Sequence, residues 1–439
     1  MRKTKIAQKL CAAMCLLALT LSLLTACGGK QPANNPDGAQ SSGDGETVEL
    51  TYYTLPGYQE QNANALALFN EQYPNIKVNL VELPTDSNKQ FQTLSTVMQA
   101  HDSSIDVFEI DCTWPQTFIS AGWVASLDDV LTEEERAEHY ENAVNIGYYN
   151  GHQYTLPTFI NSGVLFYRKD ILEKYGYEVP TTWDDLIQIS KEVMEKDPEI
   201  TSGFSSAWKQ YEGLVCCALE FIWSAGGDIL DEDGNVIINS PETAKGLQIM
   251  YDMIYTDKIT EPGINGYMWV DSRSPFYSGN VLFIRDWPTT INGANNPESS
   301  NVVDKVGFAP LPCGPAGLND NTMGGWQIGV SAYSEHQNEA KLLAKFMSNY
   351  EVQKIRAIGS QLVPSRPAVL EDPEVIEAVP FFNDLIAVGA NTKARPRTAY
   401  YEELSGVLQQ GISSVLTNGT DIPSALTQME TQIKEIMSR

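Results

Sequence analysis

The chain has 439 residues and a formal net charge of −27, from 56 acidic and 29 basic side chains. So acidic a surface repels phosphate backbones and anionic headgroups, which argues against nucleic-acid binding and against charge-driven membrane binding. We interpret the charge as a solubility feature.

The first 26 residues have the pattern of an export signal. Basic residues lie only between positions 2 and 9, and residues 10–24 are apolar with two exceptions. This pattern is typical of a secretory signal, and it is shorter than the ~20 residues that a membrane-spanning helix needs. Cys27 follows directly after Leu-Thr-Ala, which resembles a bacterial lipoprotein signal with an acylated cysteine. We predict a lipoprotein signal peptide at 1–26 and a lipid anchor at Cys27, on the extracellular face of the cell membrane. The alternative is a plain secretory signal with an incidental cysteine.

A flexible tether is expected next. Residues 28–46 contain no large apolar side chain and are rich in Gly, Pro, Asn and Ser. Such a segment buries too little surface to offset its ordering entropy. We therefore predict an acylated cysteine with a flexible tether at 27–46, followed by enough chain for two domains.

The first part of the folded region alternates short β-rich runs with amphipathic helices. Strands are predicted at 48–53, 76–81 and 105–110, with helices at 61–73 and 91–99 between them. The helical stretch at 61–73 places its apolar residues on one face. Strand–helix–strand alternation predicts an α/β layer with parallel pairing.

The same alternation recurs further along the chain. A strand is predicted at 163–168, and Thr182 with Asp185 has the spacing of a capping box at a helix start. Residues 226–239 predict a hairpin, and the stretch from Tyr400 is expected to be mostly helical.

Chemistry-bearing motifs are few. The four histidines form no HExxH pattern, and the sequence has no G-x-S-x-G, P-loop or dinucleotide-binding glycine pattern. The cysteines after the leader, at 112, 216, 217 and 313, have no metal spacing. They fit small core residues, and a Cys112–Cys313 disulfide stays open. We expect no catalytic residue, metal or cofactor, although paired carboxylates of a glycoside hydrolase stay open as an alternative.

Aromatic and polar residues recur in the loops beside predicted strands. In open α/β sheets, ligands bind outside the carboxyl ends of the strands. Flat rings beside carboxylates and guanidinium groups suit a carbohydrate, whose C–H face stacks on a ring while its hydroxyls bind polar groups. The residues concerned are Asp111, Trp114, Tyr211, Trp287, Gly325, Trp326 and Arg395.

An ordered series of segments is similar to a known family. These segments are 106–111, 165–170, 180–183, 209–213, 283–287, 323–326 and 394–398. Together they resemble bacterial extracellular solute-binding proteins of carbohydrate ABC importers, the family that includes maltose- and trehalose/maltose-binding proteins. The resemblance runs from about residue 48 to the C-terminus.

The resemblance implies an α/β fold of the periplasmic-binding-protein-like type II, with two lobes, a multi-segment hinge and a ligand cleft between the lobes. The N-terminal lobe is expected at 47–157 plus 326–361, and the C-terminal lobe at 158–325 plus 362–439. The chain is expected to cross between them near 156–162, 322–328 and 360–366.

The resemblance also implies ligand-binding residues. Glu60 and Asp111 are expected to bind sugar hydroxyls, and Tyr211, Trp287 and Trp326 to stack on or wall the sugar. The backbone at Gly325 and the side chain of Arg395 are expected to complete the polar contacts. Trp114 and Asn161 complete the predicted site.

Two positions depart from the trehalose/maltose relatives, which usually carry Trp where Thr158 stands and Asp where Asn161 stands. Loss of a ring and of a charged acceptor removes contributions of ~1 kcal/mol or more each. The departures leave the sugar's identity open and the binding class unchanged.

The resulting hypothesis is a lipid-anchored, monomeric receptor that captures a disaccharide or short oligosaccharide by cleft closure. It would deliver the sugar to an ABC permease pair driven by a cytoplasmic ATPase. The alternatives are a surface glycoside hydrolase and a binder of a non-sugar solute, such as a peptide or polyamine.

Overall fold

The computed structural model describes residues 47–439, and these residues form one compact unit. The predicted signal peptide, Cys27 and the tether lie outside the described residues. Within 47–439, no helix is both long and apolar enough to cross a membrane.

The first lobe is built around a six-stranded sheet in which β1 pairs in parallel with both β2 and β3, as predicted. Helices α1, α12 and α13 cover one face of the sheet, and α2 and α3 cover the other. Successive side chains of β3 point to opposite faces of the sheet. Val107 packs in the core under α1, α12 and α13, and Phe108 packs in the core under α2 and α3. The elements in chain order are β1 (Val48–Thr54), α1 (Gln59–Gln72), β2 (Ile76–Glu82), α2 (Ser87–Gln99), β3 (Val107–Asp111), α3 (Pro115–Ser120), α4 (Glu133–Ala137), α5 (Glu141–Val144), η1 (Asn145–Gly147), β4 (Tyr148–Tyr149), β5 (His152–Gln153) and β6 (Thr155–Ser162), with β11 (Asn321–Val330), α12 (Gln337–Met347), α13 (Tyr350–Ser360) and β12 (Thr392–Lys393) added later.

The second lobe is built around a four-stranded sheet in the order β10-β7-β9-β8. Strand β7 is antiparallel to β9 and β10, whereas β8 is parallel to β9. Helices α6 to α9, α17 and α18 form one large core against this sheet, and α10 and α14 to α16 contribute to another. The elements are β7 (Val164–Arg168), α6 (Lys169–Tyr175), α7 (Trp183–Lys196), β8 (Ser202–Ser205), α8 (Glu212–Ser224), α9 (Pro241–Tyr255), η2 (Ile264–Gly266), α10 (Trp269–Ser278), β9 (Val281–Asp286), α11 (Thr290–Ala294), β10 (Val306–Ala309), α14 (Pro367–Leu370), α15 (Pro373–Ala378), α16 (Phe382–Val388), α17 (Tyr401–Asn418) and α18 (Ile422–Met437).

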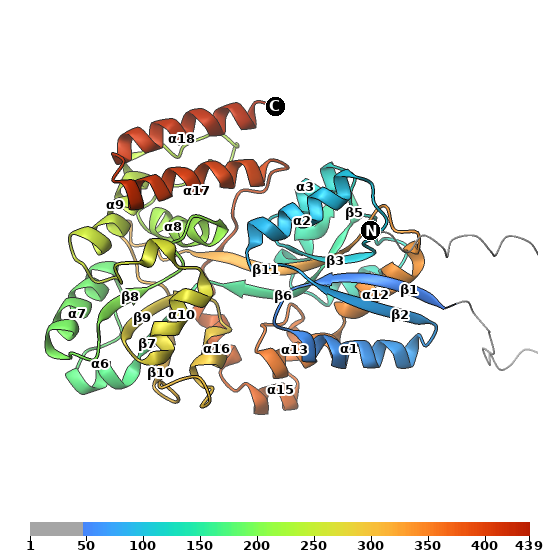
Figure 1. Ribbon diagram of the computed structural model, residues 1–439, viewed down its shortest axis with the longest axis horizontal. Helices are drawn as coiled ribbons and strands as arrows, with labels where there is room; N and C mark the ends of the chain where they lie inside the picture. Colours follow the sequence, from blue (N-terminus) through green and yellow to red (C-terminus); the bar gives the residue numbers. More distant parts are fainter. Residues whose placement is uncertain (1–46) are drawn as a thin grey trace, which may run out of the picture. The chain divides into compact units, whose positions relative to one another are not determined.

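Two long strands connect the lobes. Figure 1 shows β6 and β11 running side by side between the two groups of elements. They pair antiparallel from Met323–Ser162 to Gly329–Thr155, and the register shifts after Trp326. The segment after α13 lies beside β6 as a third crossing segment, because the Ile160 amide of β6 donates to the Val363 carbonyl at 2.9 Å. The exact residue boundaries given above for the two lobes stay a prediction.

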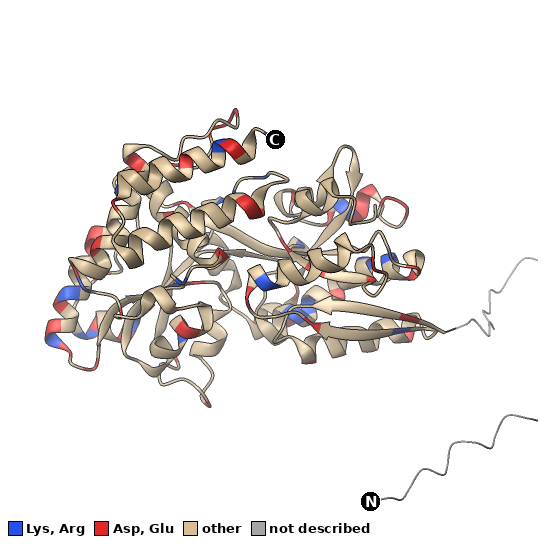
Figure 2. Ribbon diagram, turned by 45° about the horizontal axis from the view of Figure 1, so that its top comes forward, with Lys and Arg blue, Asp and Glu red and all other residues tan. Residues whose placement is uncertain are grey.

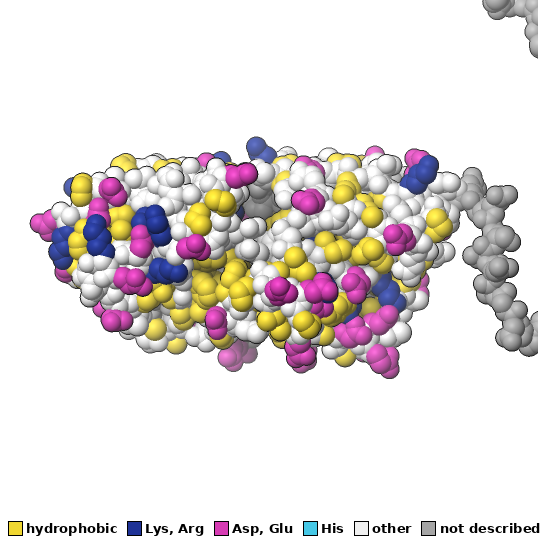
Figure 3. Space-filling view, turned by 90° about the horizontal axis from the view of Figure 1, so that it is seen from below, with side chains coloured by type: hydrophobic (Ala, Val, Ile, Leu, Met, Phe, Trp, Pro, Cys, Tyr) yellow, Lys and Arg dark blue, Asp and Glu magenta, His cyan; other side chains and the backbone are white. Residues whose placement is uncertain are grey.

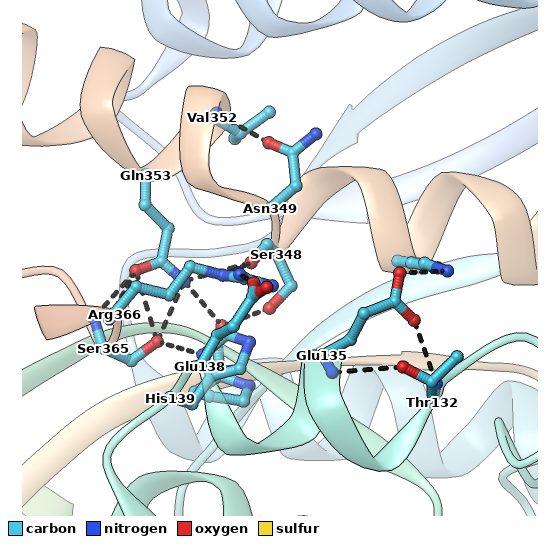
Figure 4. Close-up of polar contacts among 12 residues, drawn as sticks. Thr132, Glu135, Glu138, His139, Ser348, Asn349, Val352, Gln353, Ser365 and Arg366 are labelled. Carbon is cyan, nitrogen blue, oxygen red and sulfur yellow. Dashed lines mark hydrogen bonds and ion pairs between the residues drawn. The ribbon is translucent and has the colours of Figure 1, made fainter. Parts of the chain in front are cut away.

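A polar cluster holds this third segment against the first crossing strand. The Gln353 side chain accepts from the backbone amides of Ser365 and Arg366 and donates to the Pro157 carbonyl at 3.3 Å. Ser348 donates from its hydroxyl to the same carbonyl at 2.7 Å. Figure 4 shows Gln353 of α13 meeting Ser365 and Arg366 of the segment that follows, with Glu138 and His139 from an earlier part of the chain beside them. The buried amide of Gln353 thus ties two crossing segments to α13.

The same cluster contains a buried histidine. Nδ1 of His139 lies 2.8 Å from the Ser365 hydroxyl, and Arg366 forms an ion pair with Glu138. Burial, together with the charge of Arg366, lowers the pKa of His139 to about 3. The histidine is therefore neutral near pH 7, and its contact with Ser365 is an uncharged hydrogen bond.

Local sequence signals account for several element boundaries. Helix α2 begins at Ser87 rather than at the predicted residue 91, because the Asp86 side chain caps its first turn. The capping box of Thr182 and Asp185 is present. The predicted hairpin at 226–239 is wrong in extent: an isolated bridge joins Leu230 to Val236, and no strand is assigned there.

Charged side chains are dispersed over the surface. Figure 2 shows acidic residues on elements of both lobes, and the face in Figure 3 carries acidic side chains along its whole length. This distribution fits the interpretation of the charge as a solubility feature. The cysteines at 112, 216, 217 and 313 are free thiols in the described chain, so the possible Cys112–Cys313 disulfide is not formed.

Candidate functional site

A cavity of about 250 Å³ lies where elements of both lobes meet. The first lobe contributes the loop after β1, the start of α2 and the end of β3. The second lobe contributes the start of α8, helix α10 and the loop after β9. The crossing strands β6 and β11 and the loop residue Arg395 also line it. Cavities in this position, at a domain interface and beyond strand ends, are typical ligand sites.

Two glycines of β11 let other groups approach the strand closely. A Cβ on Gly324 would lie 2.8 Å from the indole ring of Trp287, so this ring lies almost against the backbone. Gly325 has φ +125°, and a Cβ there would meet the Phe159 carbonyl at 2.7 Å. Only glycine combines this backbone conformation with such close packing. The glycines therefore bring Trp287 and Phe159 to the same stretch of the cavity lining.

Trp269 and Trp287 form an aromatic wall on a charged support. Their ring centroids are 5.5 Å apart, and the Arg285 guanidinium carbon lies 5.1 Å and 4.4 Å from the respective centroids. Arg285 and Glu220 form an ion pair in which each side chain is 1 % exposed. Glu220 also accepts from the Thr322 amide of β11 at 3.0 Å. A buried pair fixed by several bonds keeps both rings in place.

A second arginine lines the same wall. Arg273 of α10 donates from Nε to Oδ2 of Asp286 at 2.6 Å and from Nη2 to Oδ1 at 2.9 Å. Oδ1 of Asp286 also accepts from the Trp287 amide at 2.7 Å. The bidentate pair fixes the orientation of a guanidinium group at the cavity surface.

Asp111 provides an acceptor on the opposite side. It is the last residue of β3 and lies opposite Trp326 in the register of β3 and β11. Its Oδ1 accepts from the Thr113 amide, the Thr113 hydroxyl and Nη2 of Arg395, at 3.0, 2.8 and 3.2 Å. Among the described residues, Oδ2 accepts no hydrogen bond. One carboxylate oxygen thus orients the group, and the other is available to a ligand.

Arg395 joins the two sides of the cavity. Besides its bond to Asp111, it donates from Nη1 to Oε1 of Glu212 at 2.6 Å. Oε1 also accepts from the Tyr401 hydroxyl at 2.5 Å. Burial raises the pKa of the nearby Glu402 to about 8, with further contributions from the charges of Glu212 and Asp111. Three carboxyl groups therefore share the neighbourhood of one guanidinium, and Glu402 is largely protonated at neutral pH.

Four buried polar atoms on the cavity residues have no partner in the described part of the chain. They are Oε1 of Gln90, Oδ1 of Asn161, the hydroxyl of Tyr211 and Nε of Arg395. Buried polar groups are almost always hydrogen-bonded in folded proteins, and unpaired ones cost ~1–3 kcal/mol each. Their concentration at one cavity indicates a place for a polar ligand.

Seven of the nine residues predicted to bind a ligand line this cavity: Asp111, Asn161, Tyr211, Trp287, Gly325, Trp326 and Arg395. The other two lie elsewhere. Glu60 is exposed in the first turn of α1. Trp114 is 1 % exposed and packs edge-on against Trp326 at 5.7 Å, so it supports a cavity residue from the core.

Other cavity residues were not predicted. Trp269 and Arg273 lie one helical turn apart on α10, and Tyr58 and Gln90 come from the start of α1 and from α2. The i, i+4 spacing of Trp269 and Arg273 is the signal that could have suggested a shared face. Thr158 is buried and its hydroxyl donates to the Trp326 carbonyl at 3.1 Å, outside the cavity lining.

Comparisons with known proteins place the chain in a family. Residues 49–354 match the family of bacterial extracellular solute-binding proteins. The chain belongs to this family. A probable ABC transporter-binding protein of Deinococcus radiodurans is 33 % identical over 371 residues, which cover 82 % of this chain and 87 % of that protein.

Solved structures agree with this assignment. The maltose-bound MalE3 of T. maritima is 37 % identical and superposes with a TM-score of 0.84, covering 89 % of this chain and 100 % of that one. The GacH receptor of Streptomyces glaucescens, solved unliganded and with acarbose, has a TM-score of 0.79 at 23 % identity, covering 89 % of this chain and 99 % of that one. The predicted two-lobed binding-protein fold is confirmed. As a member of an extracellular solute-binding family, the chain is a binding protein and not an enzyme.

Proposed function

We propose that the protein captures a sugar, a disaccharide or short oligosaccharide, in the cavity between its lobes and presents it to an ABC importer. The observation that carries the proposal is the pairing of aromatic rings with unpartnered buried polar atoms around one cavity. A pyranose has apolar C–H faces and a rim of hydroxyls that donate and accept. Such a ligand matches both features at once.

The geometry suggests a role for each part of the lining. Trp287, backed by Gly324 and Arg285, provides a fixed surface on which a sugar face can stack, and Tyr211 and Trp326 enclose it. Oδ2 of Asp111 and Oδ1 of Asn161 accept from hydroxyls, and Nε of Arg395 donates. No step of bond cleavage is needed, so the sugar leaves unchanged.

The named relatives support a saccharide ligand. MalE3 was solved with maltose, and a relative 23 % identical over 299 residues, from Halalkalibacterium halodurans, is named an arabinooligosaccharide-binding protein. Its alignment covers 67 % of this chain and 66 % of that protein. The names differ in sugar, so they support the class of ligand rather than one compound.

The proposal includes the partners and location predicted from the sequence. Cleft closure on the sugar would produce the form that docks on a permease pair driven by an ATPase. A lipid on Cys27 would hold the protein, as a monomer, at the extracellular face of the membrane. Mass spectrometry of Cys27-containing peptides from membrane fractions tests the anchor: an unmodified cysteine would contradict it.

A sugar panel tests the function. Isothermal titration and thermal unfolding with maltose, trehalose, malto-oligosaccharides, arabino-oligosaccharides and monosaccharides should identify at least one ligand. At a hundredfold excess over Kd, ligand binding should stabilise the protein by about 2.7 kcal/mol. A panel in which no carbohydrate shifts unfolding, while a peptide or polyamine does, would replace the sugar by a non-sugar solute. Shortened malto-oligosaccharides in excess of the protein would support the hydrolase instead.

A further inference from the structure

Helix α8 begins at the junction of the lobes without a cap of its own. The first four amides of a helix have no partner within the helix, and a side chain at the N-cap position commonly binds one of them. The N-cap residue of α8 is Tyr211, and within residues 47–439 its side chain makes no capping hydrogen bond. The first amide of the helix, that of Glu212, instead donates to Oδ1 of Asn88 at 3.3 Å.

Asn88 belongs to the other lobe. It is the second residue of α2, which packs on the six-stranded sheet, whereas α8 packs in the core of the second lobe. Figure 1 shows α8 lying beside α17 and α2 facing them from the first lobe. The cap of α8 is therefore supplied across the junction of the lobes, by a residue next in sequence to the lining residue Ser87.

The side-chain nitrogen of Asn88 also forms a hydrogen bond across the junction of the lobes. Its Nδ2 donates to Oε1 of Gln409 on α17 at 2.8 Å. Gln409 donates to the Ser405 hydroxyl at 2.8 Å, and Ser405 donates to Oε2 of Glu212. The four residues form a closed ring of hydrogen bonds in which Asn88 is the one member from the first lobe.

The ring also determines what Glu212 can do. Its Oε1 is occupied by Arg395 and Tyr401, and Oε2 by Ser405. Although Glu212 lines the cavity, its carboxylate is bonded on both oxygens by protein groups. It orients Arg395 rather than receiving a ligand hydroxyl.

We propose that Asn88 is a positioning residue that acts as a latch: it caps α8 and binds α17 across the lobes, and so holds the cleft closed around the ligand. Opening the cleft by separating α2 from α8 breaks both amide bonds at once and leaves the first amide of α8 to solvent. The latch slows ligand release without contacting the ligand. This inference rests on the proposed function for its role, whereas the contact itself is independent of it.

The first test is the contact, which needs no ligand. Hydrogen–deuterium exchange at the Glu212 amide should be roughly tenfold faster in Asn88→Ala than in the wild-type chain, because the amide loses its acceptor. Asn88→Asp keeps an acceptor and should retain most of the protection. Asn64→Ala, at an exposed position of α1, should leave the exchange unchanged. Equal exchange in Asn88→Ala and wild type would overturn the latch.

The second test is the rate of ligand release, with the sugar found in the panel and tryptophan fluorescence as the signal. Asn88→Ala should raise the dissociation rate roughly tenfold, equivalent to about 1.4 kcal/mol, with little change in the association rate. Adding Gln409→Ala should increase the dissociation rate by less than the two single effects multiplied, because both variants break the same ring. Unchanged release in Asn88→Ala, or fully independent effects, would overturn the role in closure. A wild-type chain that binds no sugar would refute the proposed function but leave the exchange result as the test of the contact.

Discussion

The two sides of the cavity are held in place by different means. On the second lobe, Trp269 and Trp287 lie over Arg285, whose charge is balanced by Glu220 at 1 % exposure. On the first lobe, Asp111 is oriented through a single carboxylate oxygen. One side presents aromatic rings held by a buried ion pair, and the other presents a carboxylate oxygen that can bond a ligand.

This difference has a physical reason. A ring that stacks on a sugar gains from a fixed plane, and a buried ion pair beneath it cannot rearrange without exposing an uncompensated charge. A hydroxyl partner needs a free lone pair, so its support must occupy one oxygen and leave the other. The position of the aromatic rings should therefore depend on the buried ion pair beneath them, and the orientation of Asp111 on local hydrogen bonds.

The largest expected effect follows from removing the support of the aromatic side. Glu220→Ala leaves the Arg285 guanidinium buried and unpaired and takes an acceptor from the Thr322 amide. We expect a loss of about 3–5 kcal/mol in the free energy of unfolding, measured in urea. The control is Glu403→Ala, which removes an ion pair with Arg439 whose side chains are about half exposed. That variant should lose at most ~1 kcal/mol. Similar losses in the two variants would show that the buried pair is not the support.

The next effect separates stacking from folding on the same side. Trp287→Ala should weaken binding of the sugar found in the panel by roughly 10- to 150-fold, about 1.4–3 kcal/mol, because a half-buried ring is removed from the cavity wall. Trp123→Ala is a matched control, since Trp123 is also half-buried but lies outside the cavity lining. Titration calorimetry should show unchanged affinity in that control. Equal affinity losses would mean that Trp287 acts only through packing.

The same contrast explains what the sequence could predict. Asp111 and Trp287 were predicted because they stand at or just beyond strand ends, and a strand end fixes the edge of the sheet at which a side chain lies. Trp326 was predicted at the entry to a strand, and it lies within β11. The parallel pairing of β1 to β3 followed from alternation alone. Residues tied to strand geometry are therefore accessible to reasoning from the sequence.

Residues on helices were harder to predict. Trp269 and Arg273 reach the cavity because α10 presents one face to the first lobe, and this depends on how the two sheets meet. Trp114 follows a strand end as Asp111 does, yet the backbone turns into α3 and places its ring in the core. Sequence periodicity predicts which residues share one face of a helix, but not which part of the protein that face packs against.

The last prediction tests the electrostatics of the polar side through a pH dependence. The pKa of Glu402 is raised from 4.5 to about 8 by burial and by the charges of Glu212 and Asp111. Between these pH values the folded chain holds a proton that the unfolded chain has released. The contribution of Glu402 to the free energy of unfolding is therefore fully present below pH 4.5. It is lost as the pH rises to about 8, and the free energy of unfolding falls by at most ~1.4 kcal/mol per pH unit. Glu402→Gln should remove this slope from the free energy of unfolding measured between pH 5 and 8, whereas Glu403→Gln, at an exposed neighbouring position, should retain it. An unchanged slope in Glu402→Gln would show that Glu402 does not hold the extra proton. The charges of the carboxyl groups around Arg395 would then be balanced by that guanidinium, as the charge of Glu220 is balanced by Arg285 on the aromatic side.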